Sequence, residues 1–198
     1  MKNALIIILI ILWGSIYAQA SEMAESYLQE SKGNYELALQ SMQRLKAKEP
    51  SDAFYQIRIA WLEYLLGQYD ASLESYLAAL QLKEHLDARI GVINCLLALG
   101  RYQELLGKVD TLLVAHPENQ ILLAKGAYAA YLAKDYRKAA EYYQKIIDIS
   151  PWDMESRGYL VNNLFLAGKE VEALRQLRLL LKYYPHSSII ELYKDRLK

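Results

Sequence analysis

The chain is poor in the residues that carry most metal and redox chemistry. Its 198 residues include one cysteine, three histidines and four prolines. With Cys95 alone, no internal disulfide can form, and its place in an apolar helical stretch predicts a small buried hydrophobe. His85, His116 and His186 stand far apart, and none belongs to a metal-binding pair or a His-Glu-x-x-His sequence. The sequence therefore predicts no metal site and no cofactor.

Neither sign of charge is in excess, because 23 basic residues balance 23 acidic ones. This balance gives no indication of nucleic acid binding. The charge is unevenly spread: residues 21–84 carry 6 basic and 10 acidic residues, and residues 168–198 carry 7 and 4. Ordinary solvated helix faces account for such an asymmetry. A glycine-rich phosphate loop and a Gly-x-Ser-x-Gly elbow are both missing from the sequence, so we predict that the chain is not an enzyme.

The N-terminus has the pattern of a bacterial export signal. Lys2 precedes an unbroken apolar run, Ala4–Trp13, and Ala18-Gln19-Ala20 supplies the small residues that a signal peptidase reads. We predict cleavage after Ala20 and a periplasmic or secreted protein that begins at Ser21. The alternative is an uncleaved membrane anchor, but ten apolar residues fall short of the about 20 that span a bilayer.

One short turn repeats along the rest of the chain. A Gly-x-Tyr triplet begins at Gly33, Gly67 and Gly100, with weaker copies beginning at Lys134 and Gly168, and the starts lie 34, 33, 34 and 34 residues apart. Each of the four prolines follows the first residue of a triplet by 17 residues: Pro50, Pro117, Pro151 and Pro185. Glycine allows the chain to reverse after one helix, and proline stops the next.

The apolar spacing between these marks is helical, and no stretch alternates strictly, so we predict helices and no strands. The predicted first helices of the pairs span 21–32, 53–66, 86–99, 119–133 and 153–167. The predicted second helices span 35–48, 69–83, 102–115, 136–149 and 170–183. A final helix near 187–197 would cap the apolar end of the array.

These features together resemble the tetratricopeptide repeat, which has a 34-residue period and the same turn and terminal proline. A small residue three positions after the aromatic completes the likeness in four copies, as Ala38, Ser72, Ala139 and Ala173, while Leu105 departs from it. The resemblance implies an all-α, right-handed α-solenoid of antiparallel helix pairs. The predicted organisation is a signal peptide at 1–20, five helix pairs at 21–186 and a capping helix at 187–198.

Two places depart from the family pattern. In the first helix, Glu22, Glu25 and Gln29 stand where apolar residues are expected, which predicts a loose or exposed end. In the second copy, Glu63 occupies the position of a buried aromatic. A charged residue is rarely buried without a partner, so either this helix is rotated or Glu63 reaches solvent through a gap.

In proteins of this family, first helices line a concave groove in which peptides bind, and residues at i, i+4 and i+7 form its stripe. Carried onto this chain, the predicted stripe is Phe54, Ile57, Trp61, Tyr64, Ile90, Asn94, Leu97, Ile121, Ala124, Tyr128, Tyr131, Gly158, Asn162 and Phe165. It is aromatic and aliphatic, which suits binding hot spots, although the same aromatics can pack between helices. The basic residues that hold a peptide carboxylate in some members are missing from it, and Arg58 and Lys125 are weaker candidates.

The resemblance and the export signal favour a non-enzymatic scaffold of the bacterial cell envelope. Such a scaffold would bind an apolar or extended segment of a protein partner in its groove, with neither nucleic acid nor a stable membrane span. Two alternatives stay open: a self-assembling structural protein that stacks through its terminal repeats, and an accessory subunit of an envelope enzyme or export complex.

Overall fold

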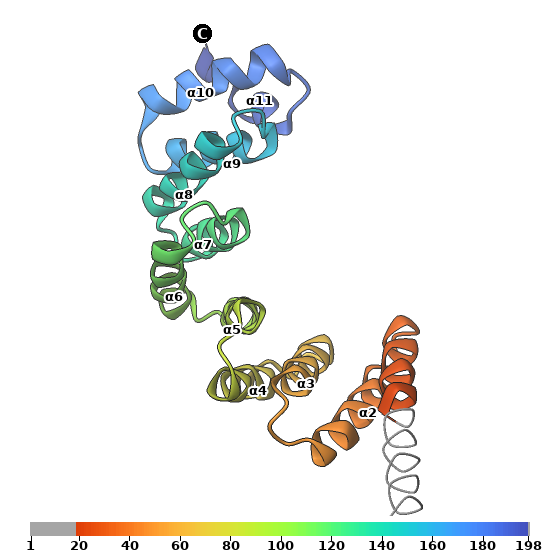
Figure 1. Cartoon of the computed structure of the whole chain (residues 1–198). Coiled ribbons are helices and arrows are strands. Elements are labelled where there is room, and N and C mark those ends of the chain that lie inside the picture. The colour runs from red at the N-terminus through yellow and green to blue at the C-terminus, as the bar shows by residue number, and fades with distance from the viewer. Residues whose placement is uncertain (1–18, 198) are drawn as a thin grey trace, which may run out of the picture. The chain divides into compact units, whose positions relative to one another are not determined.

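A computed structural model describes residues 19–197, which form helices joined by short turns and contain no strand (Figure 1). Most of the predicted signal peptide, residues 1–18, lies outside the described residues, so export and cleavage stay predictions. No helix within residues 19–197 is long and apolar enough to cross a membrane. The described helices fall into two compact units, one ending at Leu99 and the other beginning at Gly100.

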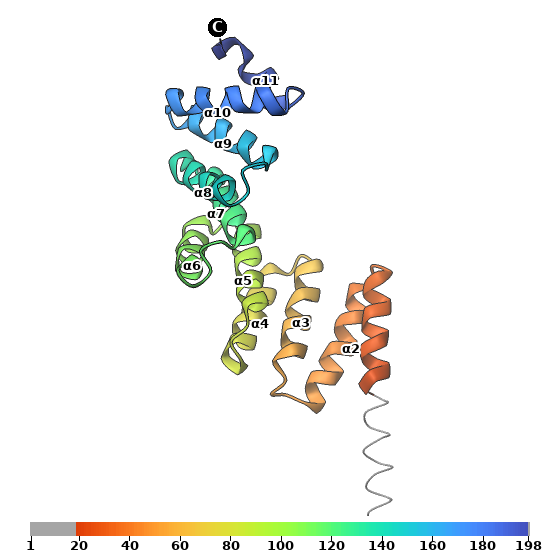
Figure 2. The ribbon, with the colours of Figure 1, turned by 45° about the horizontal axis from the view of Figure 1, so that its top comes forward.

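The helix bounds follow the predicted ones within one or two residues over most of the chain. In the first unit, residues 19–31 are helical and are followed by α2 (Tyr35–Lys48), α3 (Ala53–Leu65), α4 (Tyr69–Leu82) and α5 (Leu86–Ala98). The second unit contains α6 (Tyr102–Ala115), α7 (Gln120–Leu132), α8 (Tyr136–Ile149), α9 (Met154–Leu166), α10 (Glu170–Tyr183), α11 (Ser188–Tyr193) and the 3₁₀ helix η1 (Lys194–Leu197). Figure 2 shows consecutive helices such as α3 and α4 packed side by side. The all-α prediction of tandem helix pairs is confirmed.

The turn triplets reverse the chain through a left-handed residue. Gly67 has a φ of 74°, and the amide of Gln68 donates to the carbonyl of Glu63 across the end of α3 (2.9 Å). The same left-handed conformation falls on Lys134 in the degenerate copy, with a φ of 61°. A Cβ atom makes that conformation costly, so the fourth turn stores backbone strain that the glycine turns avoid.

The first unit has its core between α2 and α3. Ala38, Met42, Leu45 and Leu62 are fully buried there, and Met23 from the preceding helical segment packs against them. In the next helix pair, α3 and α4, a serine holds the small-residue position of the repeat. This Ser72 is fully buried, and its hydroxyl donates to the carbonyl of Ala60 (2.6 Å). A small side chain at this position lets the two helices of a pair approach closely.

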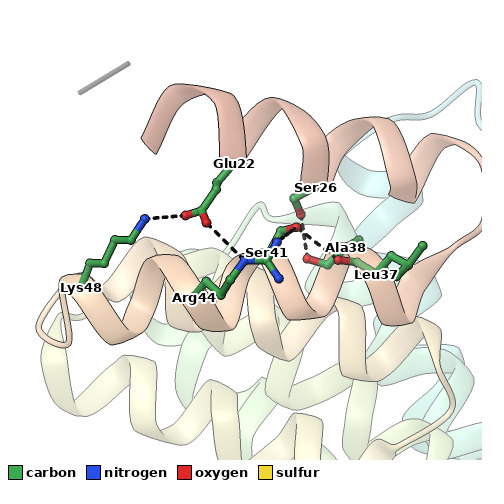
Figure 3. A network of polar contacts seen from close by, with 7 residues as sticks. All are labelled: Glu22, Ser26, Leu37, Ala38, Ser41, Arg44 and Lys48. Atoms are coloured by element: carbon green, nitrogen blue, oxygen red, sulfur yellow. Dashed lines mark hydrogen bonds and ion pairs between the residues drawn. The ribbon is translucent and has the colours of Figure 1, made fainter. Parts of the chain in front are cut away.

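The prediction of a loose or exposed end at residues 21–32 is correct only in part: most of this segment is exposed, but polar contacts attach it to α2. Glu22 forms ion pairs with Arg44 (3.2 Å) and Lys48 (2.8 Å) of α2, and the fully buried Ser26 donates to the carbonyl of Ala38 (3.1 Å), as Figure 3 shows. Of the polar residues that replace the apolar ones of the family pattern, Glu22 has its partners on the facing helix, whereas Gln29 donates to Glu25 of its own helix and accepts from Asn34 in the turn. The hydrophobic pattern therefore underestimates how firmly this segment packs.

The buried carboxylate of Glu63 fits neither predicted arrangement fully. Its neighbours in α3 keep the family phase, because Ala60 and Leu62 are fully buried. Glu63 is half-buried, and its Oε2 has no hydrogen-bond partner among the described residues. Burial, with a smaller contribution from the nearby Glu74 carboxylate, raises the pKa of Glu63. The helix is thus not rotated, and the carboxylate carries an unfavourable desolvation.

The α-helix near the C-terminus is shorter than predicted. The single helix expected at 187–197 is broken into α11 and η1. Ile190 is buried in a cluster with Val161, Leu177 and Leu180, so α11 packs on both α9 and α10. This packing covers the apolar end of the last helix pair and also brings α11 onto part of the predicted stripe.

Candidate functional site: the first-helix stripe and a tyrosine pocket

In the first unit, two aromatic residues of the stripe, Trp61 and Tyr64, already contact other side chains of the protein. Trp61 donates from Nε1 to Oε1 of Glu30 (2.8 Å) and stacks on Tyr64, with ring centroids 5.9 Å apart. Tyr64 in turn lies against Tyr69, at 5.2 Å. Phe54 is more open, with 45% of its surface exposed. Ile57, Ile90, Asn94 and Leu97 are half-buried.

The carboxylate of Glu30 holds the Trp61 side chain in place. It also accepts a hydrogen bond from Arg58, whose guanidinium lies 4.5 Å from the centroid of the Tyr27 ring. Burial opposes the ionisation of Glu30, but the hydrogen bonds from Arg58 and Trp61 outweigh it and hold the pKa of this carboxyl below its usual value. Arg58, the weaker candidate for a carboxylate clamp, is therefore already neutralised by Glu30.

In the second unit, the stripe residues of α7 are exposed to solvent. Ile121, Tyr128 and Tyr131 expose 56%, 48% and 39% of their surfaces, and neither tyrosine hydroxyl has a hydrogen bond within the described residues. Tyr131 lies against the Tyr136 ring, at a centroid distance of 5.8 Å. Ala124 is exposed as well, and Lys125 is half-buried with a pKa lowered by burial. The α7 part of the predicted stripe is free to contact another molecule.

The α9 part of the stripe is covered by α11. Gly158 is buried, and a Cβ added to it would lie 3.3 Å from the Ile189 side chain. Tyr193 donates to Oδ1 of Asn162 (2.8 Å) and stacks on Phe165, with ring centroids 4.2 Å apart. The sequence did not reveal this contact, because nothing in the repeat pattern places α11 against the first-helix face.

A cavity of about 550 Å³ lies between the open and covered parts. We call it the tyrosine pocket; its lining residues are Tyr128, Tyr131, Tyr143, Tyr159, Asn162, Asn163, Ile189 and Leu192. Among residues 19–197, no charged side chain lines it. The volume lies within the range of pockets that bind small molecules or single side chains. Three of its residues, Tyr128, Tyr131 and Asn162, belong to the predicted stripe, and the other five do not.

Hydrogen bonds and ring stacking fix several of the side chains that line the pocket. The Tyr159 hydroxyl donates to Glu155 (3.0 Å), and its ring stacks on Tyr143 with centroids 5.3 Å apart. Burial, followed by the proximity of Tyr159, raises the pKa of Tyr143 to about 12, so its hydroxyl stays neutral. Asn163 donates to the Tyr159 carbonyl (2.8 Å), while its buried Oδ1 has no partner among the described residues.

One position of the repeat distinguishes the pocket from the corresponding place in the first unit. Tyr76 and Tyr143 hold the same repeat position, as do Gly91 and Tyr159. In the first unit, the Tyr76 ring presses on Gly91 so closely that a Cβ there would lie 2.3 Å from Cζ. In the second unit, the Tyr159 ring instead stacks on Tyr143 and lines the pocket. An aromatic at the position of Gly91 is the sequence signal that could have revealed this site.

The other chemistry-bearing residues lie apart from the pocket. His85, His116 and His186 are exposed, and residues 19–197 hold no group of three or more His, Cys, Asp and Glu residues that could bind a metal ion. Cys95 is fully buried with its Sγ 3.2 Å from Oγ of Ser72, and burial raises the pKa of its thiol. Nothing in this arrangement indicates catalysis.

Comparison with known proteins agrees with the repeat. Residues 125–151 match the family model described as the tetratricopeptide repeat. No curated protein matches the chain significantly in sequence. Similar solved structures include residues 41 to the end of MamA from Desulfovibrio magneticus RS-1, at 17% identity and a TM-score of 0.74, with 86% of this chain and 97% of that one covered.

Two further structures extend the likeness. A tetratricopeptide repeat protein from Parabacteroides merdae matches with 21% identity and a TM-score of 0.76, covering 91% of this chain and 71% of its own. YrrB, described as a protein of this kind with an unusual peptide-binding site, matches with 12% identity and a TM-score of 0.71, covering 88% and 90%. At these identities the likeness shows a shared fold.

Proposed function

We propose that this chain, which has the fold of tetratricopeptide repeat proteins and matches their family model over residues 125–151, is a non-enzymatic scaffold whose tyrosine pocket holds an apolar or extended segment of a partner protein. The observation that carries this proposal is an uncharged cavity of about 550 Å³ whose lining includes two exposed tyrosines, Tyr128 and Tyr131. Tyrosine rings offer a large contact area at low entropic cost and are enriched at binding hot spots. The peptide-binding site ascribed to YrrB supports the same role on this fold.

The lining of the pocket limits what it accepts. A charged group would lose its hydration inside it and gain no countercharge, because no charged side chain lines the cavity. The aromatic rings favour aliphatic or aromatic side chains, and the amides of Asn162 and Asn163 suit the backbone of an extended segment. We therefore place uncharged, apolar residues of the partner in the pocket.

We also propose that the protein acts in the bacterial cell envelope. The support is the charged, apolar and small-residue pattern of residues 1–20. N-terminal sequencing of the protein purified from its own cells tests this location. Ser21 as the first residue would support export, whereas a protein that retains Met1 in a cytoplasmic fraction would contradict it.

Photo-crosslinking in living cells tests the binding site. A photoreactive phenylalanine analogue replaces Tyr128 in the pocket or, as a matched control, Tyr64 in the occupied stripe of the first unit. We expect a discrete crosslinked product at position 128 and a much weaker one at 64, with mass spectrometry identifying the captured segment. Equal crosslinking at both positions, or none at 128, would count against the proposed site.

A further inference from the structure

The outward face of α10 carries three basic residues. Arg175, Arg178 and Lys182 are spaced at i, i+3 and i+7, so they share one side of the helix. All three are exposed, and none of them forms an ion pair within residues 19–197. This face points away from the core formed by Ala173, Gln176, Leu177 and Leu180 of the same helix.

The repeat provides an internal comparison for this face. On α10 the four outward positions hold Val171, Arg175, Arg178 and Lys182. At the same repeat positions, the other four second helices hold acidic or neutral residues and a single basic one. The acidic residues are Glu36, Asp70, Glu74, Asp110, Glu141 and Asp148, and the basic residue is Arg137. The cationic face is thus a property of α10 and not of the repeat.

An exposed aromatic pair borders the same face. Trp152, in the loop before α9, has 72% of its surface exposed and meets Tyr183 edge to face, with centroids 5.2 Å apart. Lys182 lies over the Tyr183 ring, with Nζ 4.8 Å from its centroid. The equivalent loop positions in the other copies hold Ser51, His85, Glu118 and His186. Trp152 is therefore specific to this end of the chain, as the basic residues are.

We propose that the α10 face, formed by Arg175, Arg178, Lys182, Tyr183 and Trp152, docks on an anionic phospholipid surface. Basic residues near such a surface are attracted by its negative potential, and each strengthens partitioning by about fivefold. Tryptophan and tyrosine are the residues that settle at headgroup depth, where one side of the ring is apolar and the other is wet. Electrostatic attraction alone would suit an acidic protein equally, but the exposed Trp152 favours the lipid surface. This proposal is independent of the tyrosine pocket.

Co-sedimentation of the full-length chain with lipid vesicles tests the proposal. The readout is the ratio of binding to vesicles with about one-quarter phosphatidylglycerol over binding to pure phosphatidylcholine, so the apolar contribution of the N-terminal run cancels, and its charge is the same in every variant compared. We expect a ratio well above one that falls as salt rises from about 0.1 M to about 0.5 M. Changing Arg175, Arg178 and Lys182 together to glutamine lowers the ratio by roughly a hundredfold, or to one.

A charge-matched variant keeps the test specific. Lys32→Gln, Lys83→Gln and Arg137→Gln together remove the same charge from exposed positions on other elements and should leave the ratio nearly unchanged. Trp152→Ala should weaken binding to anionic vesicles at both salt concentrations. A ratio near one for the unaltered chain, an equal loss in the charge-matched variant, or binding to polyglutamate without binding to vesicles would each overturn the proposal.

Discussion

The two units place the same repeat positions in opposite states. In the first unit, Trp61 donates to Glu30 and stacks on Tyr64, so the stripe is held by contacts within the chain. In the second unit, Tyr128 and Tyr131 stay exposed beside a cavity of about 550 Å³. The family pattern alone treats both sets as groove residues. Tyr131 keeps a ring contact with Tyr136 that matches the contact of Tyr64 with Tyr69, so the difference lies mainly between Trp61, which has Glu30 and Tyr64 as partners, and the exposed Tyr128.

The glycine of α5 should show the largest effect on stability. An alanine at Gly91 would place its Cβ against the buried ring of Tyr76, which has no room to retreat. We expect Gly91→Ala to lower the free energy of unfolding by about 3 kcal/mol, measured by urea denaturation. Gly107→Ala is the control, because nothing lies within 4 Å of a Cβ there, and helix propensity should raise stability by about 1 kcal/mol. Equal effects of the two substitutions would refute the close packing of the first unit.

Removing the paired and unpaired aromatics should separate packing from binding. Trp61→Ala deletes a half-buried ring and leaves Glu30 without one of its donors, so we expect a loss of about 2 kcal/mol in the free energy of unfolding. Tyr128→Ala removes a ring that is 48% exposed and has no hydrogen bond in the described structure, and should cost less than about 1 kcal/mol. A larger loss at Tyr128 than at Trp61 would reverse the assignment of the two stripes.

The half-buried carboxylate of Glu63, whose Oε2 has no partner among the described residues, gives the first unit a pH dependence. Burial raises its pKa in the folded state, so the folded chain binds more protons than the unfolded chain between the two pKa values. Stability at this site therefore falls as the pH rises through that window. Glu63→Gln should raise the free energy of unfolding by about 1 kcal/mol near pH 8 and by almost nothing near pH 4. A gain of the same size at both pH values would contradict the role of the charge.

The fourth turn offers the smallest of these effects. Lys134 adopts a φ of 61°, which glycine tolerates without strain. We expect Lys134→Gly to raise stability by a few tenths to about 1 kcal/mol, and Gly168→Ala, at the same position of the next turn, to lower it by about 1 kcal/mol. Thermal unfolding followed by circular dichroism compares the two, and a stabilising Gly168→Ala would be inconsistent with the strain argument.

The repeat period allowed the helices to be predicted from the sequence, but only part of the pocket. The triplets at Gly33, Gly67 and Gly100 mark helix ends because their backbone conformation is local. The same repeat phase also predicted Tyr128 and Tyr131 as groove residues. Ile189 and Leu192 could not be predicted as pocket residues, because they reach the pocket only when α11 folds back onto α9. The contact of Glu30 with Trp61 joins residues 31 apart, and hydrophobic periodicity does not report polar partners at that distance.

Binding of the crosslinked segment, prepared as a peptide, tests the central claim most directly. Its dissociation constant is measured for the unaltered chain, for Tyr128→Ala with Tyr131→Ala, and for Phe54→Ala, an exposed aromatic of the first-unit stripe. Loss of hot-spot aromatics should raise the dissociation constant of the double variant by at least about thirtyfold, because truncating a single hot-spot residue costs about 2 kcal/mol or more. Phe54→Ala should stay within about twofold of the unaltered chain. A peptide that binds the double variant normally but loses affinity with Phe54→Ala would place the site in the first unit and contradict the account.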